Sequence, residues 1–278
     1  MLFVFDRNIL DALQDRDDRR ITFIRESLVE LDGKLRARGS RLVVRIGDPV
    51  DVVPAMAAEF GADRVVTGFD VDPYALRRDG EVGRRLTEAG RELVTPVDVT
   101  VHIPGAVRTG DGRPFRVFTP YSRAWRRDLQ PAKHLREHVP DPDRLTASPP
   151  PSDDWSYEAM GFVRNDLWLE PGEEAARRRL EEFVPKVAAY ADDRNEPAKE
   201  GTSGLSVHLR FGTLSIRECV RAAVALGPAG EKWLTELIWR DFYQDVLAEF
   251  PEVVELPFQA QYGKIVYPGH DDHFEAWT

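Results

Sequence analysis

Strand-like and helix-like segments alternate over roughly the first hundred residues, and this alternation limits the possible folds more than any other feature. Short apolar runs at residues 2–5, 42–46, 64–69 and within 93–101 predict buried strands. Between them, residues 16–38, 52–60 and 76–89 carry apolar side chains at helical spacing. Such alternation gives right-handed crossovers and a parallel sheet covered by helices. We therefore predict a Rossmann-like α/β domain over residues 1–130, with ligands beyond the carboxyl ends of its strands.

The composition changes after this domain. Proline-rich stretches between residues 131 and 170 cannot continue a helix or a central strand and predict an interdomain linker, with Trp155, Phe162 and Trp168 pinning it to the surface. Helical periodicity then returns at roughly 173–191, 215–226 and 230–249. We expect residues 171–278 to form a second, helical region.

Composition excludes several classes of protein. The single cysteine, Cys219, rules out a disulfide framework and a multi-cysteine metal site. We expect no metal centre, although His134 and His138 have helical i, i+4 spacing. No apolar run is long enough to span a bilayer, and the N-terminus does not resemble a signal peptide. We expect a cytoplasmic monomer without membrane contact. The net charge of −10 excludes a surface that is basic throughout, but not a local basic cleft.

Two segments of the second region carry candidate chemistry. Residues 201–206 form a small, hydroxyl-rich turn whose backbone N–H groups and hydroxyls could hold a diphosphate, although an ordinary helix cap would look the same. Further on, Trp233, Glu236, Arg240 and Tyr243 fall on one helical face. This face suits a flat heteroaromatic ligand, and a protein core remains the equal alternative.

Five motifs, in order along the chain, resemble those of the DNA photolyase/cryptochrome family. They are Arg116-Val-Phe-Thr-Pro-Tyr-x-x-Ala-Trp125, Tyr190-x-x-x-Arg194, Gly201-Thr-Ser-Gly-Leu-Ser206, Phe211-Gly-Thr-Leu-Ser215 and Glu236-Leu-Ile-Trp-Arg-Asp-Phe-Tyr243. The resemblance covers nearly the whole chain. It implies an N-terminal α/β antenna domain and the first part of an all-helical domain that binds FAD.

The resemblance also implies roles for individual residues. The FAD-binding positions it matches are Tyr190, Thr202, Ser203, Gly204, Leu205, Ser206, Trp233 and Arg240. The positions that face a flipped pyrimidine dimer in DNA are Arg194, Glu236 and Trp239, with Arg240 and Tyr243 also expected at the DNA. Trp239 would stack on the lesion, Glu236 would hydrogen-bond a thymine edge, and Arg194 would screen negative charge. Trp277 matches the outermost member of the family's electron-transfer chain.

Glu236 favours one subclass within the family. Glutamate at this position is typical of cyclobutane pyrimidine dimer photolyases, which repair DNA under light by electron transfer from reduced FAD. Two alternatives remain open at this point. A cryptochrome-type blue-light photoreceptor shares most of these residues, and an unrelated α/β nucleotide-binding module would bind ATP or AMP instead of flavin.

The chain also departs from the family pattern. It opens at what resembles the family's second strand, and the family's remaining flavin-pocket motifs would lie beyond Thr278. We therefore expect a fragment, truncated at both ends, that neither holds FAD tightly nor repairs DNA alone. Arg113 stands where folate-binding members carry glutamate, so a folate antenna is not implied and the second chromophore stays unknown.

Overall fold

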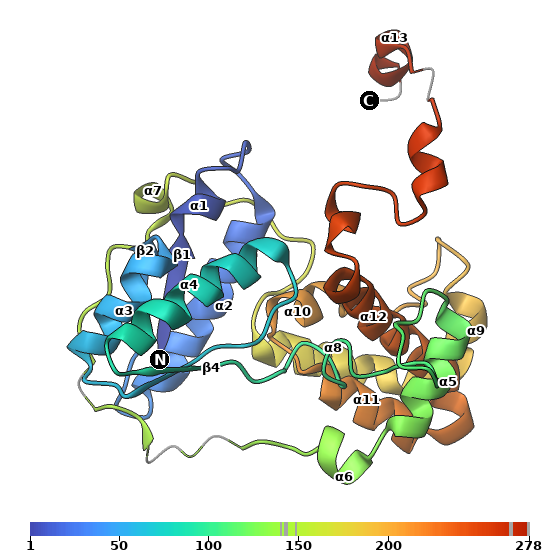
Figure 1. Ribbon diagram of the computed structural model, residues 1–278, viewed down its shortest axis with the longest axis horizontal. Coiled ribbons are helices and arrows are strands. Elements are labelled where there is room, and N and C mark those ends of the chain that lie inside the picture. The colour runs from blue at the N-terminus through green and yellow to red at the C-terminus, as the bar shows by residue number, and fades with distance from the viewer. Residues whose placement is uncertain (140, 142–143, 148, 267–268, 277–278) are drawn as a thin grey trace.

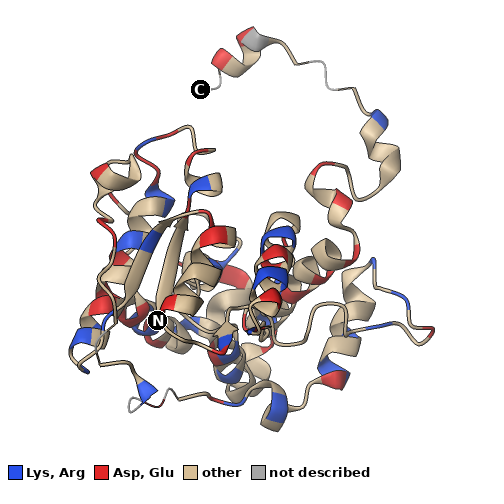
Figure 2. Ribbon diagram, turned by 60° about the vertical axis from the view of Figure 1, so that its left-hand side comes forward, with Lys and Arg blue, Asp and Glu red and all other residues tan. Residues whose placement is uncertain are grey.

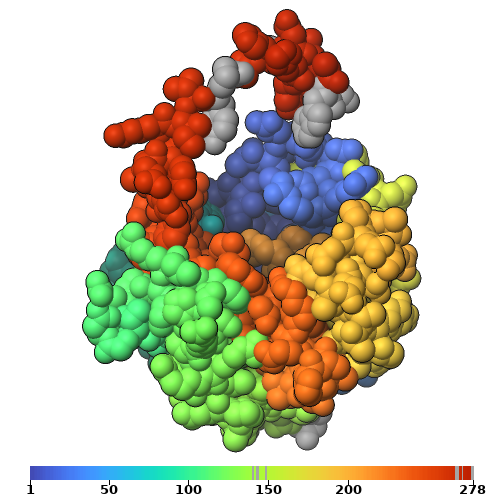
Figure 3. Space-filling model, turned by 90° about the vertical axis from the view of Figure 1, so that its right-hand side faces the viewer, coloured from blue at the N-terminus to red at the C-terminus, as the bar shows by residue number. Residues whose placement is uncertain are grey.

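The computed structural model describes the whole chain except residues 140, 142–143, 148, 267–268 and 277–278. The described residues form an α/β lobe and a helical lobe that lie side by side (Figure 1). Val253 and Phe258 still pack on the helical lobe, and the segment after Phe258 projects away from both lobes. Figure 3 shows this projecting segment in red, standing off the rest of the molecule.

Four short strands form the centre of the α/β lobe. Strand β1 (Leu2–Asp6) pairs in parallel with β2 (Val43–Gly47), and β3 (Arg64–Val66) pairs in parallel with β4 (Glu92–Val94). Helices α2 (Arg19–Arg36), α3 (Pro49–Glu59) and α4 (Pro73–Glu88) are the connections between successive strands. The predicted α/β arrangement of strands and crossover helices is thus confirmed, but the described strands form two separate two-stranded sheets.

Two of the strands are shorter than predicted. The chain beyond β4 continues alongside β3 for a few residues, where the Phe69 N–H donates to the Pro96 carbonyl at 2.9 Å. Pro96 has no N–H to return to the ladder, so the regular pairing ends at Val94 and the predicted strand does not reach Val101.

The proline-rich segment returns from the helical lobe to the α/β lobe and covers the outer edge of β2. The Val44 N–H donates to Ser152 Oγ at 2.9 Å, and the Asp153 N–H donates to the Val44 carbonyl at 3.0 Å. Phe162 is buried, and Trp155 stacks under the Arg25 guanidinium. Trp168 is 65% exposed, so the expectation that it helps to pin this segment was wrong.

The helical lobe is built around the long helix α12 (Glu231–Glu249). The predicted helix over 173–191 is broken: α8 (Glu173–Phe183) gives way to a 3₁₀ segment (Val184–Ala189), because Pro185 cannot donate within an α-helix. The other helices are α1 (Arg7–Leu10), α5 (Phe118–Asp128), α6 (Pro131–His134), α7 (Tyr157–Met160), α9 (Tyr190–Asp193), α10 (Ser206–Phe211), α11 (Ile216–Ala225) and α13 (Asp271–Glu275), with 3₁₀ turns at Gly227–Gly230, Pro251–Val254 and Ala260–Lys264.

The largest apolar cluster of the described chain lies in the helical lobe and also includes residues that precede the second region in sequence. Besides α8 to α12, it includes Val101, Val107, Tyr121, Trp125 and Leu135. Residues before the linker therefore pack with the second region, and the division at residue 130 stays a prediction. The α/β lobe holds two smaller clusters, one around β1, β2 and α2, and one around α3, α4, β3 and β4.

Candidate functional site

An ion pair joins two helices at the surface of the helical lobe. Arg194, at the end of α9, pairs with Glu236 on α12, and Lys232 Nζ lies 3.0 Å from the same carboxylate. Burial alone would raise the pKa of Glu236, but hydrogen bonds from Arg194 and Lys232 outweigh it and lower that pKa. Glu236 is therefore a carboxylate at neutral pH, and its side chain remains 25% exposed to a ligand.

Aromatic side chains lie against this ion pair. The Arg194 guanidinium sits 5.3 Å from the ring centroid of Tyr190, and Tyr190 meets the edge of Phe183 at 5.6 Å. Phe183 also contacts Trp233, whose side chain is only 2% exposed. Trp233 and Tyr190 therefore belong to the core beneath the ion pair.

The hydroxyl-rich turn at residues 201–206 packs directly on α9. A Cβ atom built on Gly201 would come within 2.5 Å of the Asp193 backbone, so only glycine allows this approach. Arg179 Nε donates to the Ser203 carbonyl at 2.8 Å, and the same guanidinium lies where a Cβ on Gly204 would stand. Leu205 is buried, whereas the hydroxyl residues Thr202 and Ser206 are exposed. The turn thus presents hydroxyls beside a fixed positive charge.

Trp239 forms an aromatic stack at the boundary between α5 and α12. Its ring lies parallel to Phe118, with centroids 3.6 Å apart and an interplanar angle of 6°. Tyr243 stacks nearby at 5.5 Å and is 62% exposed. Phe118 already covers one face of Trp239, so a base would have to displace Phe118 or use the exposed remainder of the ring.

Arg240 points away from the Glu236 ion pair. Its guanidinium donates to the carbonyls of Val99 and Leu209, the latter at 3.2 Å, and burial lowers its pKa. The predicted single face of Trp233, Glu236, Arg240 and Tyr243 is thus divided in the structure. Trp233 lies in the core, Glu236 and Arg240 have separate partners, and Tyr243 faces solvent.

Asp241 on α12 is the polar centre of the contact between the two regions. Its Oδ2 accepts hydrogen bonds from Trp125 Nε1 at 2.9 Å and from the Val101 N–H at 3.0 Å. Burial raises the pKa of Asp241 to about 6, in spite of these donors.

Arg179, Lys232, Phe118 and Asp241 were not among the predicted site residues. Phe118 and Asp241 lie inside quoted motifs to which no role was assigned at these positions, and Lys232 precedes Glu236 by one helical turn. Arg179 left no local signal. Trp277 lies outside the described residues. Acidic and basic residues are interspersed along the helices in the view of Figure 2.

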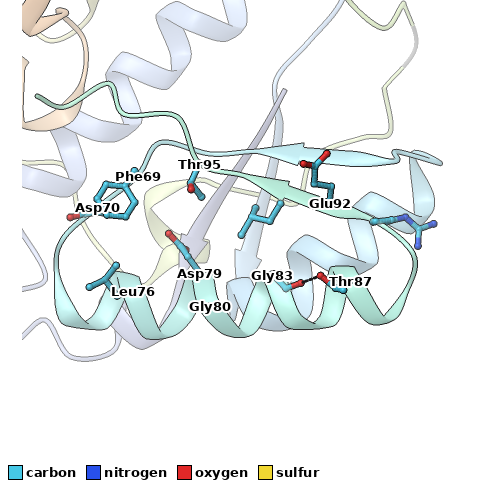
Figure 4. Close-up of a pocket in the computed structure, with 11 residues that line it drawn as sticks. Phe69, Asp70, Leu76, Asp79, Gly80, Gly83, Thr87, Glu92 and Thr95 are labelled. Atoms are coloured by element: carbon cyan, nitrogen blue, oxygen red, sulfur yellow. Dashed lines mark hydrogen bonds between the residues drawn. The ribbon is translucent and has the colours of Figure 1, made fainter. Parts of the chain in front are cut away.

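A concave region lies in the α/β lobe, between α4 and the β3–β4 pair (Figure 4). This cavity of about 580 Å³ is lined by Asp70, Asp79 and Glu92 among apolar side chains, glycines and threonines, with Arg91 as its one basic residue. Its acidic lining disfavours a phosphate-bearing ligand.

The described residues hold no cluster of three metal-ligating side chains. Within the same residues, no helix combines the length and the hydropathy required for a bilayer span.

Comparison with known proteins identifies the family. The family model described as DNA photolyase matches residues 1–143. A deoxyribodipyrimidine photo-lyase of Synechococcus sp. strain PCC 6301 is 34% identical over 100% of this chain and 60% of its own length. An uncharacterised 31.6 kDa protein of Synechococcus sp. strain PCC 6716 is 32% identical over 87% of this chain and 88% of its own length.

The solved structures agree with this assignment. A class III photolyase from Agrobacterium tumefaciens superposes with a TM-score of 0.85 at 25% identity, covering 99% of this chain and 58% of the other. A cryptochrome of Synechocystis sp. PCC6803, at 20% identity and a TM-score of 0.78, shares the fold. The chain spans about 60% of the length of the curated photo-lyase relatives it matches. On these matches, the chain belongs to the DNA photolyase family.

Proposed function

We propose that this chain forms the antenna domain and part of the flavin- and lesion-binding surface of a cyclobutane pyrimidine dimer photolyase. The observation that carries this proposal is the ion pair of Arg194 with Glu236, beside the turn at residues 201–206. A carboxylate held ionised at a partly exposed position can accept a hydrogen bond from a thymine N–H, and the neighbouring guanidinium supplies positive charge.

The residues around the turn fit the diphosphate of FAD. The turn offers the exposed hydroxyls of Thr202 and Ser206, together with the Arg179 guanidinium fixed on the Ser203 carbonyl. When bound, reduced FAD supplies the electron for dimer cleavage. The chain's own contribution is to hold the diphosphate, to exclude water with the aromatic core of Tyr190 and Trp233, and to orient the lesion through Glu236.

A flavin titration tests the cofactor part of the proposal. The purified chain is mixed with FAD, separated from free flavin, and its visible flavin absorbance is compared with its protein content. We expect measurable but substoichiometric retention. Stoichiometric, tightly held flavin would refute the view that this chain is an incomplete binding unit, and ATP or AMP binding without flavin binding would refute the photolyase assignment.

An oligonucleotide assay tests the lesion part. A single-stranded oligonucleotide with one thymine dimer is compared with its undamaged counterpart in binding to the wild-type chain and to Glu236→Gln and Glu231→Gln. Glu231 lies on the same helix but pairs with Arg126. We expect a preference for the dimer that Glu236→Gln reduces about tenfold, consistent with one hydrogen bond to a charged group. Equal binding of the two oligonucleotides by the wild-type chain would contradict a role in lesion recognition and would favour the photoreceptor alternative.

A further inference from the structure

Helix α2 of the α/β lobe contacts both of the helices that hold the hydroxyl-rich turn at residues 201–206. The turn leads directly into α10, and Arg179 of α8 donates to its Ser203 carbonyl. Figure 1 shows α8 and α10 on the side of the helical lobe that faces α2. The position of the turn relative to the Arg179 guanidinium therefore depends on how α8 and α10 are held.

The N-terminus of α8 is capped by side chains of α2. The N-cap residue of α8 is Gly172, which has no side chain that could accept a hydrogen bond from the first turn. Instead, the Gly172 N–H donates to Ser27 Oγ at 3.0 Å, and the Glu174 N–H donates to Glu30 Oε1 at 3.3 Å. A carboxylate here also suits the positive end of the helix dipole. The N–H groups at the start of α8 are thus satisfied by the other lobe.

Phe23 of α2 packs on α10. Its side chain is 2% exposed, and its ring centroid lies 5.5 Å from that of His208 and 5.3 Å from that of Phe211. Ser27 Oγ donates to the Phe23 carbonyl at 2.8 Å, so the cap of α8 and the contact with α10 share one turn of α2. Burial and the nearby Arg179 guanidinium lower the pKa of His208, so α8 also approaches α10 at this point.

We propose that α2 positions the turn for its ligand, with Phe23 and Ser27 as positioning residues that act through α10 and α8. The α/β lobe then sets part of the affinity of a site that lies in the helical lobe. The inference rests on the proposed function where it takes this ligand to be FAD. Because coupling between two sites is reciprocal, FAD at the turn should also strengthen the contacts of α2 with α8 and α10.

The side-chain N–H signal of Arg179 tests the proposal without any ligand. In the flavin-free, nitrogen-15-labelled chain, nuclear magnetic resonance should show the Arg179 Nε–H protected from exchange with water by its bond to the Ser203 carbonyl. We expect Phe23→Leu and Ser27→Ala each to speed this exchange at least about threefold, since the bond opens more often when its supports are weakened. Ser27→Thr keeps the hydroxyl and should restore the protection.

Flavin fluorescence titration measures the effect on affinity. Phe23→Leu should weaken FAD binding about tenfold and Ser27→Ala about threefold. Phe162→Leu is the matched control for the first variant, because Phe162 is also 2% exposed. Thr87→Ala is the control for the second, because Thr87 Oγ1 donates to the carbonyl four residues earlier, as Ser27 Oγ does. Both controls should leave the Arg179 signal and the FAD affinity unchanged.

The reciprocal effect is measured in the wild-type chain, where FAD should slow hydrogen exchange at the amides of Gly172 and Glu174. An Arg179 signal that is identical in the wild type and in both α2 variants would overturn the proposal. Equal changes in FAD affinity from Phe23→Leu and Phe162→Leu would do the same. If Phe23→Leu does not fold, the two Ser27 variants decide. A wild-type chain that does not bind FAD would contradict the proposed function, whereas the Arg179 signal would still decide whether α2 positions the turn.

Discussion

Asp241 is a buried carboxylate that connects helix α12 to residues before the linker. It is 2% exposed, and both donors to its Oδ2 come from residues before the linker, Val101 and Trp125. Its Oδ1 has no hydrogen-bond partner among the described residues. Ionisation of Asp241 is therefore costly, and the cost depends directly on the two donors that remain.

Replacing Trp125 by Phe should destabilise the chain more at pH 8 than at pH 5. The folded-state pKa of Asp241 is raised from 3.8 to about 6, so the stability it contributes is present at low pH and is lost as the pH rises through about 6. Trp125→Phe removes a donor that favours the ionised form. We expect an additional loss of about 2 kcal/mol at pH 8, where Asp241 is ionised, and mainly a packing loss at pH 5.

Urea unfolding of wild type, Trp125→Phe and Trp168→Phe at both pH values measures this effect. Trp168 is exposed and serves as the matched control. Comparison between variants is needed because Asp245, which also lies at this junction, titrates in the same range, with a pKa raised by burial to about 6. Burial also lowers the pKa of His102 from 6.5 to about 4, so unfolding between these two pH values is coupled to proton uptake by His102. A Trp125→Phe loss that does not change with pH would contradict the assignment.

The sequence could predict Glu236 and Arg194 but not Asp241. All three lie in the motifs that carry the family resemblance, and Asp241 shares its motif with Glu236, but the resemblance implied a role only for Glu236 and Arg194. The importance of Asp241 depends on burial by residues more than a hundred positions away, and no local pattern reports such burial. Arg179 was not predicted for the same reason: it is one of several charged residues on its helix, and its contact with the Ser203 carbonyl appears only in the folded structure.

At the scale of elements, the turn at residues 201–206 combines a glycine in the left-handed backbone region with a fixed cation. Gly204 has φ +59° and Gly212 has φ +72°, so alanine at either position should cost about 1 kcal/mol of stability. Only at Gly204 would the new Cβ meet the Arg179 guanidinium, and nothing lies within 4 Å at Gly212. Because the end of an arginine side chain can move, the two variants should be similar in stability.

Ligand binding should separate these two glycine variants. Gly204→Ala displaces Arg179 from the Ser203 carbonyl and should weaken the binding of FAD about tenfold, whereas Gly212→Ala should leave it unchanged. Flavin fluorescence titration measures both, with circular dichroism as the check on folding. Equal affinities of the two variants for FAD would mean that Arg179 does not serve the diphosphate.

The stack of Phe118 on Trp239 should couple α5 to α12 energetically. Parallel rings at 3.6 Å predict an interaction of about 1 kcal/mol beyond the area they bury. A double-mutant cycle with Phe118→Leu and Trp239→Leu measures this coupling, and a cycle of Phe118 with the exposed Trp168 is the control, for which we expect none. Zero coupling in the first cycle would show that the stack contributes only buried area.

Element types were easier to predict than element lengths. Alternating periodicity gave the order of strands and helices correctly, because each segment carries its own burial pattern. The lengths of β3 and β4, and the break after Phe183, depend on where Pro96 and Pro185 interrupt hydrogen bonding. Both prolines are visible in the sequence, but their effect depends on which N–H the neighbouring element needs.

At the scale of the whole molecule, the apolar material is distributed unevenly between the lobes. The helical lobe has one large cluster that includes both sides of the linker, whereas β3, β4, α3 and α4 share a cluster with only Ala57, Val82 and Leu86 as buried members. Local opening costs less where few apolar contacts are lost. The β3–β4 end of the α/β lobe should therefore open before the helical lobe does.

Hydrogen exchange under native conditions measures this difference. We expect the amides of Val65 and Val94, which belong to the β3–β4 ladder, to exchange at least about tenfold faster than buried amides in the middle of α12. A pair of three-residue strands without further paired neighbours among the described residues can separate without global unfolding. The amides of Phe3 and Phe5 in β1 should be intermediate, since β1 packs on a larger cluster and β2 is covered on its outer side. Equal protection of all three groups would instead mean that the two lobes unfold as one cooperative unit and that the separate sheets are coupled through the helices between them.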